Sequence, residues 1–237
     1  DPFETLKKYG PDATRWYMIS NANPWENLKF DLEGIDEVRR KFFGTLYNTY
    51  SFFSLYANLD GFNYSEKQVE NRPEIDRWII SELNSLIEEV DSCYADYEPT
   101  KAARAIQHFT DEHLSNWYVR LCRRRFWKGD YTSDKVAAYQ TLYTCLENLA
   151  ILMSPIAPFF ADRLYRDLND ITRLRNTTSV HLALFPESDS KKIDKPLEER
   201  MELAQQISSM TLALRKKVNI RVRQPLSKIL IPVDEPG

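Results

Sequence analysis

Apolar residues recur along this chain at the three- and four-residue spacings that place side chains on one face of an α-helix. Between residues 73 and 96 the apolar positions are Ile75, Ile79, Leu83, Leu86 and Val90. This spacing predicts a helix that starts at Pro73 and runs to about residue 96. The stretches 25–72 and 100–154 contain no proline, which would interrupt a helix, so they can hold further long helices.

Glycine and proline positions predict where the other helices begin and end. Gly10 and Pro11 separate two short helices near 2–9 and 11–20, and Gly61 ends a long helix near 32–59. Another helix runs from the turn at 97–100 to Gly129. Helices are also predicted at 134–153, after Pro158 to about residue 169, and at 196–218, with 170–196 mostly loop.

The C-terminal tail has a different pattern. Residues 220–223 alternate apolar and basic side chains, residues 228–231 are mostly apolar, and Pro225 lies at a turn between them. This pattern predicts a pair of short strands. The predicted fold is therefore all-α, a bundle of long antiparallel helices, with a short β element that begins at the C-terminus.

The composition excludes several functional classes. Only six glycines occur in 237 residues, and none is grouped in a phosphate-binding loop. The three cysteines are widely spaced, so we expect no metal site or other cofactor in this chain, and free thiols fit a reducing cytoplasm. No apolar run approaches the ~20 residues of a membrane span. Because the chain begins at Asp1 rather than methionine, we expect a piece of a longer protein.

The strongest candidate for a binding site is the basic run at 115–128, with the sequence SNWYVRLCRRRFWK. Arginine forms bidentate pairs with phosphate, and aromatic rings stack on unpaired bases. On a helix Trp117, Arg120, Arg124 and Trp127 would share one face. The nucleic-acid contacts predicted in this run are Arg120, Arg123, Arg124, Arg125, Trp127 and Lys128.

Two other interpretations of the run stay open. Ala102, Ile106, Phe109 and His113 continue the same helical face upstream, so Trp117 is expected to end an apolar core stripe. The arginines could instead form a solvated face whose surface ion pairs contribute little to stability.

Basic charge in this chain is local. The net charge is -3, from 32 Lys and Arg against 35 Asp and Glu, yet no acidic residue lies between Glu202 and Asp234. Within that interval, residues 215–228 form a second basic segment, and Arg221 and Arg223 are its predicted nucleic-acid contacts. A basic strip on an acidic body would orient a polyanion rather than be wrapped by it.

Catalytic arrangements are absent from the sequence. His108 and His113 are five residues apart, so they do not share a helical face. Asp12 and Arg15 are three apart and are expected to form an ion pair along a short helix. The residues alone therefore indicate a helical binding module with RNA as the candidate ligand.

Several longer segments resemble those of class I aminoacyl-tRNA synthetases. Residues 1–17, which include DPFE and YGPDATRWY, are similar to the segment that follows the Lys-Met-Ser-Lys-Arg loop of that class. Five segments resemble isoleucyl-tRNA synthetases in particular: 23–28 (NPWENL), 39–48 (RRKFFGTLYN), 97–106 (YEPTKAARAI), 113–120 (HLSNWYVR) and 123–129 (RRRFWKG). Residues 153–159 (MSPIAPF) resemble a late-bundle segment, and 222–226 (VRQPL) resemble the start of a C-terminal junction.

The resemblance implies three parts. Residues 1–30 would be a stem-contact segment after the catalytic domain, 31–195 an α-helical anticodon-binding domain, and 196–237 a helix and the start of the C-terminal junction region. The parent enzyme would be a monomeric, cytoplasmic ligase that attaches isoleucine to its tRNA with ATP and magnesium. The chain lacks the His-Ile-Gly-His and Lys-Met-Ser-Lys signatures, so it would recognise tRNA without catalysis and work beside the parent's catalytic domain.

Two alternatives to this assignment are open. The chain could be the same domain of a valyl-tRNA synthetase, because the architecture would be the same. It could also be a helical protein-interaction bundle that does not bind RNA.

Overall fold

The computed structural model of the protein describes residues 1–62, 64 and 69–231. These residues form helices and connecting loops, and none of them lies in a strand. The chain divides into two compact units, Asp1–Asp194 and Lys195–Gly237, which are described separately. The prediction of an all-α fold is confirmed for the described residues.

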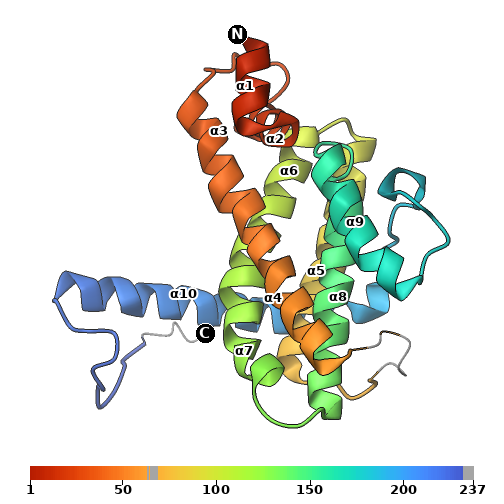
Figure 1. Cartoon of the computed structure of the whole chain (residues 1–237). Coiled ribbons are helices and arrows are strands. Elements are labelled where there is room, and N and C mark those ends of the chain that lie inside the picture. Colours follow the sequence, from red (N-terminus) through yellow and green to blue (C-terminus); the bar gives the residue numbers. More distant parts are fainter. Residues whose placement is uncertain (63, 65–68, 232–237) are drawn as a thin grey trace. The chain divides into compact units, whose positions relative to one another are not determined.

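The helices of the first unit begin and end close to the predicted positions (Figure 1). They are α1 (Pro2–Tyr9), α2 (Pro11–Asn21), α3 (Leu32–Val38), η1 (Arg39–Phe43), α4 (Gly44–Asp60), α5 (Glu74–Ala95), α6 (Pro99–His108), η2 (Phe109–Val119), α7 (Arg120–Trp127), α8 (Ser133–Met153) and α9 (Pro158–Thr172). Two short 3₁₀ segments follow, η3 (Val180–Leu182) and η4 (Ser190–Lys192). Helices α3, η1 and α4 are continuous, as are α6, η2 and α7, so each group is the single long helix that the sequence predicts.

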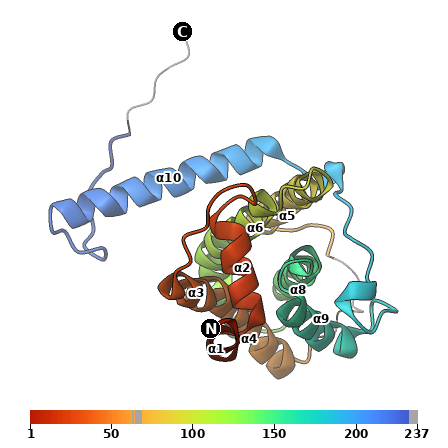
Figure 2. The same cartoon turned by 90° about the horizontal axis from the view of Figure 1, so that it is seen from above.

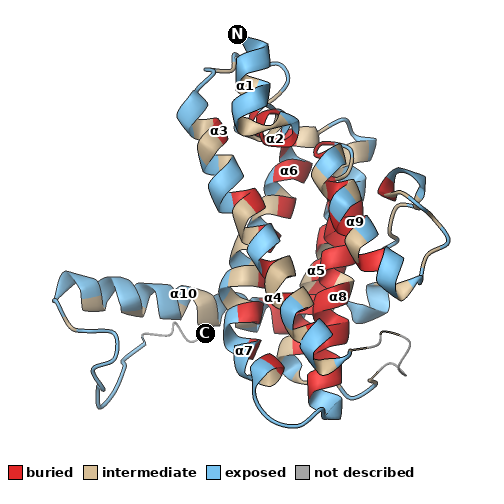
Figure 3. Cartoon of the chain, in the orientation of Figure 1, coloured by how far each residue is buried: buried red, intermediate tan, exposed pale blue. Residues whose placement is uncertain are grey.

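Helix α8 is at the centre of this unit. It packs against α9, α5, α7 and α4, and Figure 2 shows α8 and α9 side by side. Almost all of its residues are buried, which Figure 3 shows as a continuous buried stretch. A helix that is apolar on every side is stable only when neighbours cover it on every side. Truncating a buried residue such as Leu146 to alanine should therefore cost ~2–5 kcal/mol.

The N-terminal helices are joined to the bundle by polar contacts across α2 and α9. The backbone N–H of Phe160 donates to Asp12 Oδ2 at 2.5 Å, and Arg15 Nε donates to the carbonyl of Ile156 at 2.9 Å. The first turn of a helix has backbone N–H groups without intrahelical partners, and Asp12 satisfies one of them in α9. The expected ion pair between Asp12 and Arg15 is therefore wrong, because both side chains are used between helices.

The π-helical segment η2 changes which face of the long helix is buried. Each π-turn holds more residues than an α-turn, because its hydrogen bonds join residues five apart. Phe109 is buried as predicted, but Leu114 and Tyr118 take the next core positions. Trp117 is shifted away from the core and is only half-buried. The prediction that Trp117 ends the core stripe is therefore wrong, since it assumed α-helical spacing throughout.

The second unit consists of α10 (Lys195–Lys217) and the tail that follows it. Arg215 Nη1 lies within hydrogen-bond distance of the carbonyls of Arg221 (2.8 Å), Val222 (3.3 Å) and Gln224 (2.9 Å). Gln224 N–H also donates to the Arg221 carbonyl, which closes a turn at 221–224. The predicted pair of strands does not form in the described residues 220–231. An isolated two-stranded hairpin is at best marginally stable, and here the carbonyls of the first expected strand bind an arginine.

Candidate nucleic-acid interface

Helix α7 exposes a basic surface at the end of the long α6–η2–α7 helix (Figure 1). Its exposed members are Arg120, Arg123, Arg124, Trp127 and Lys128, which we call the α7 surface. None of its four cationic side chains forms an ion pair with a described residue. Their positive charge is therefore available to a ligand. The interpretation that these arginines form surface ion pairs is not supported within the part of the chain that the structure describes.

Trp127 gives this surface an aromatic side chain. It is 54% exposed, whereas its neighbour Phe126 is fully buried between the rings of Phe52 and Tyr139. The ring centroids of these two contacts lie 5.2 and 5.1 Å from that of Phe126 in edge-on arrangements. Phe126 thus fixes the last turn of α7 to the core, and Trp127 faces solvent from the same turn. An exposed ring of this kind can stack on an unpaired base.

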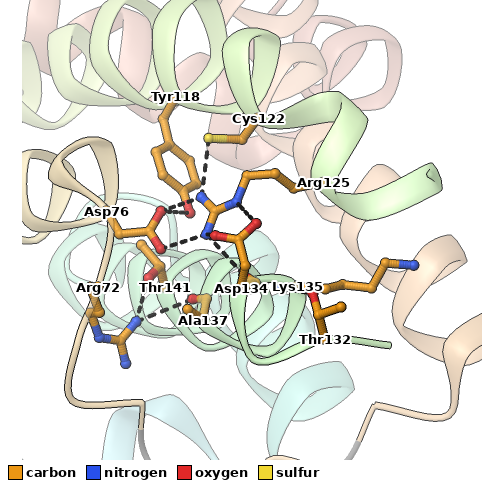
Figure 4. Close-up of polar contacts among 10 residues, drawn as sticks. All are labelled: Arg72, Asp76, Tyr118, Cys122, Arg125, Thr132, Asp134, Lys135, Ala137 and Thr141. Atoms are coloured by element: carbon orange, nitrogen blue, oxygen red, sulfur yellow. Dashed lines mark hydrogen bonds and ion pairs between the residues drawn. The ribbon is translucent and has the colours of Figure 1, made fainter. Parts of the chain in front are cut away.

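Arg125 differs from the other arginines of the run, because its side chain points into the bundle (Figure 4). Its Nη1 and Nη2 donate to Asp76 Oδ1 and Oδ2 at 2.6 and 2.9 Å, which forms a bidentate pair. Its Nε donates to Asp134 Oδ2 at 3.0 Å. The Tyr118 hydroxyl also donates to Asp76 Oδ1 at 2.9 Å, and Asp76 itself is fully buried. The structure therefore places Arg125 apart from the α7 surface.

The electrostatics of this network keep the guanidinium of Arg125 charged. Burial disfavours the charged guanidinium, but the hydrogen bond and negative charge of Asp76 outweigh burial and raise the pKa of Arg125 above its ordinary value. Burial, followed by the charge of Asp76, raises the pKa of Tyr118, so its hydroxyl stays a proton donor. Burial also raises the pKa of Cys122 to about 11, so this thiol stays neutral and unreactive near pH 7.

The loop from α7 to α8 begins at the α7 surface and ends at the same network. Gly129 has a φ of 80°, a conformation that other residues adopt at a cost, and it lets the chain turn directly after Lys128. Thr132 caps α8 by accepting a hydrogen bond from the Lys135 N–H. Lys135 is buried, and its Nζ lies 2.8 Å from Asp60 Oδ2 at the end of α4. Both ends of the loop are therefore fixed by defined contacts.

The remaining predicted contacts, Arg221 and Arg223, belong to the second unit. Both side chains are exposed and make no ion pair with a described residue. The Arg215 contacts fold the backbone around them into a turn. They form a separate basic segment, 215–228, which is described by itself.

Sequence reasoning missed the buried carboxylate that selects Arg125. Asp76 lies beside Ile75 in an apolar stripe, where it resembles an ordinary first-turn acidic residue. The sequence does contain one signal for a buried Arg125. Tyr118, Cys122 and Phe126 are spaced four residues apart, so they lie on one helical face, and Arg125 is next to that face.

Within the described residues, no group of three or more potential ligands could hold a metal ion. Among the residues that the structure describes, no helix could span a membrane.

Comparison with known proteins identifies the family. Residues 76–230 match the model of the anticodon-binding domain of tRNA ligases, and the chain belongs to this family. The matched region includes α7 and the 215–228 segment.

Individual relatives agree with this assignment. The isoleucine–tRNA ligase of Bacteroides fragilis is 65% identical over 235 residues, which cover 98% of this chain and 21% of that protein. The isoleucine–tRNA ligase of Cytophaga hutchinsonii is 61% identical over 238 residues, covering 100% of this chain and 21% of that protein. The chain therefore spans about a fifth of the length of the curated relatives it matches.

A solved structure supports the fold. The ternary complex of Agrobacterium radiobacter K84 agnB2 LeuRS with tRNA and LeuAMS contains a similar region, with a TM-score of 0.56 and 17% sequence identity. The likeness covers 82% of this chain and 21% of that chain. At this identity the likeness concerns the helical fold alone.

Proposed function

We propose that this chain is the tRNA-recognition part of an isoleucine–tRNA ligase, and that its α7 surface contacts the anticodon end of isoleucine tRNA. The observation that carries the proposal is the α7 surface itself. Four cationic side chains that form no ion pair with a described residue lie within nine residues of the chain together with one exposed tryptophan, at the end of a helical bundle whose family binds anticodons. An anticodon loop presents unpaired bases and a curved phosphate backbone, which match these two kinds of side chain.

The parent protein follows from the same proposal. It would be a monomeric, cytoplasmic ligase that joins isoleucine to tRNA with ATP and magnesium, supplied by a catalytic domain beyond this chain. Residues 1–30 would form the stem-contact segment, 31–195 the anticodon-binding domain, and 196–237 the start of the C-terminal junction, where strand pairing would involve 220–231. The division of the chain into units at Asp194 and Lys195 supports the second of these boundaries.

Binding of the chain to tRNA tests the proposal. Isoleucine tRNA should bind more tightly than the same tRNA with an altered anticodon, and binding should weaken as salt rises. A variant with Arg120, Arg123 and Arg124 changed to glutamine should bind weakly. A matched control with Arg163 and Arg166 of α9 changed to glutamine, both exposed, should bind like the wild type.

Each alternative gives its own result. Tighter binding to valine tRNA would assign the chain to a valine ligase. A wild-type chain without salt-dependent tRNA binding would favour a protein-interaction bundle and would refute the proposal.

A further inference from the structure

Arg125 stands in the middle of the basic run, yet its donors are all in use. A guanidinium has five N–H donors. They face Asp134 Oδ2 from Nε, Asp76 Oδ1 and Cys122 Sγ from Nη1, and Asp76 Oδ2 and the Asp134 carbonyl from Nη2. The side chain is also only 16% exposed. A phosphate would find no free donor here and would lie close to the carboxylate of Asp134.

These contacts join three helices at one point. Asp76 lies in the first turn of α5, Asp134 in the first turn of α8, and Arg125 in the last turn of α7. The network therefore fixes the end of α7 and the loop 128–132 against two neighbouring helices. Within the same turn, Phe126 packs into the core independently of the ion pairs.

We propose that Arg125 is a positioning residue for tRNA binding, rather than a contact to tRNA. This inference rests on the proposed function of the α7 surface. Arg125 ties the last turn of α7 to α5 and α8, so that Arg124, Trp127 and Lys128 meet the RNA already in place. Ordering these side chains before binding reduces the entropy lost when the complex forms.

The salt dependence of tRNA binding separates a positioning role from a phosphate contact. Each lost phosphate contact reduces the steepness with which log affinity falls against log salt concentration, here called the slope, by about 0.7–0.9. Arg125→Gln removes the charge of the side chain and its bidentate pair with Asp76. It should weaken binding by roughly 2- to 30-fold, the range for residues that act without touching the ligand, and leave the slope unchanged. Arg123→Gln, an exposed neighbour in the same run, is the matched control and should lower the slope.

A second variant keeps the test valid if Arg125→Gln does not fold. Asp134→Asn removes one ion pair at a half-exposed carboxylate and leaves the Asp76 pair in place. It should show the same behaviour to a smaller degree. Hydrogen exchange of the amides at 126–133 should be faster in both variants, and in the Arg123→Gln control it should match the wild type.

The outcomes are distinct. An Arg125→Gln slope that falls as far as that of Arg123→Gln would show a direct phosphate contact and overturn the inference. Unchanged affinity together with unchanged hydrogen exchange would overturn it as well. A wild-type chain that does not bind tRNA would refute the proposed function instead. In that case the exchange measurement would still show whether the network orders α7.

Discussion

The two basic regions of this chain, the α7 surface and the 215–228 segment, are held in place by different contacts. The α7 surface lies on a helix whose opposite side is fixed by buried Phe126 and by the bidentate pair of Arg125 with Asp76. The 215–228 segment follows the end of α10, and its turn is closed by Arg215 hydrogen bonds to backbone carbonyls among exposed residues. In both regions one arginine organises the backbone, while other basic side chains form no ion pair with any residue that the structure describes.

The difference between the regions concerns what a mutation would change. Around α7, the residues that shape the surface also stabilise the fold, because removing one partner of a buried ion pair leaves an uncompensated charge. In the 215–228 segment the shaping contacts are solvent-exposed, so their loss should alter local structure with little effect on stability. Mutations of the residues that shape the α7 surface should therefore change stability and tRNA binding together. Mutations of the shaping contacts in the 215–228 segment should change binding with little effect on stability.

The largest expected effect is the loss of Arg125. Arg125→Ala should destabilise the chain by ~3–5 kcal/mol, because Asp76 would stay buried without its partner. Arg215→Ala should change the free energy of unfolding by less than about 0.5 kcal/mol. Urea unfolding followed by circular dichroism measures both. Equal losses from the two variants would mean that the regions are not built differently.

Adjacent aromatic residues give the next test. Phe126→Ala should cost ~3–5 kcal/mol of stability, because it removes a fully buried ring. Trp127→Ala should instead cost ~1–3 kcal/mol of tRNA binding, the range for lost base stacking. Its melting temperature should stay close to that of the wild type. A marked fall in the melting temperature of Trp127→Ala would show that this ring is structural.

Sequence reasoning predicted the helices well because their signals are local. Apolar spacing, Gly61 and the prolines determine where most helices begin and end, and η2 is invisible to such rules since it changes the number of residues per turn. For this reason α-helical spacing predicts Trp117 as a core residue, whereas the structure buries Leu114 instead. The exposed part of the candidate site, such as Arg124 and Trp127, was found from residue types alone.

The role of Arg125 could not be predicted in the same way. It depends on Asp76, which is 49 residues distant in the chain and reaches Arg125 only through the packing of α5 against its neighbours. Residue type alone therefore grouped Arg125 with its exposed neighbours. The short β element predicted at 220–231 is not seen in the described residues for a related reason, because a strand needs a partner that alternation within one segment does not supply.

A smaller expected effect is a difference in how the two regions respond to pH, measured as the change in the chain's stability. Burial, followed by the charge of Glu112, raises the pKa of Asp111 in η2 to about 7, while Lys41 opposes this shift. Unfolded aspartate titrates near pH 4, so the native chain binds more protons between about pH 4 and 7, and stability falls as pH rises through this range. Asp111→Asn should differ less from the wild type at pH 5, where this fall is only partly complete. At pH 8 it should be more stable by ~1–2 kcal/mol, a value already reduced for solvent screening.

Thermal melts between pH 5 and pH 8 measure this difference. The 215–228 segment contains no Asp, Glu or His, so its charge should stay constant over the same range. If the difference in stability between the wild type and Asp111→Asn stayed the same from pH 5 to pH 8, Asp111 would not carry a raised pKa.

The smallest effect should come from single exposed arginines, and it tests the comparison most finely. Arg124→Gln should lower the salt slope of tRNA binding by about 0.7–0.9. Because α7 is held in place by Phe126 and Arg125, a neighbouring arginine cannot move to replace the lost phosphate contact. Arg223→Gln should lower the slope less, since Arg221 lies two residues away, is also exposed and makes no ion pair within the described part of the chain. Fluorescence anisotropy over a series of salt concentrations measures both slopes. A larger slope change for Arg223→Gln than for Arg124→Gln would make the 215–228 segment the main phosphate contact and the α7 surface the secondary one.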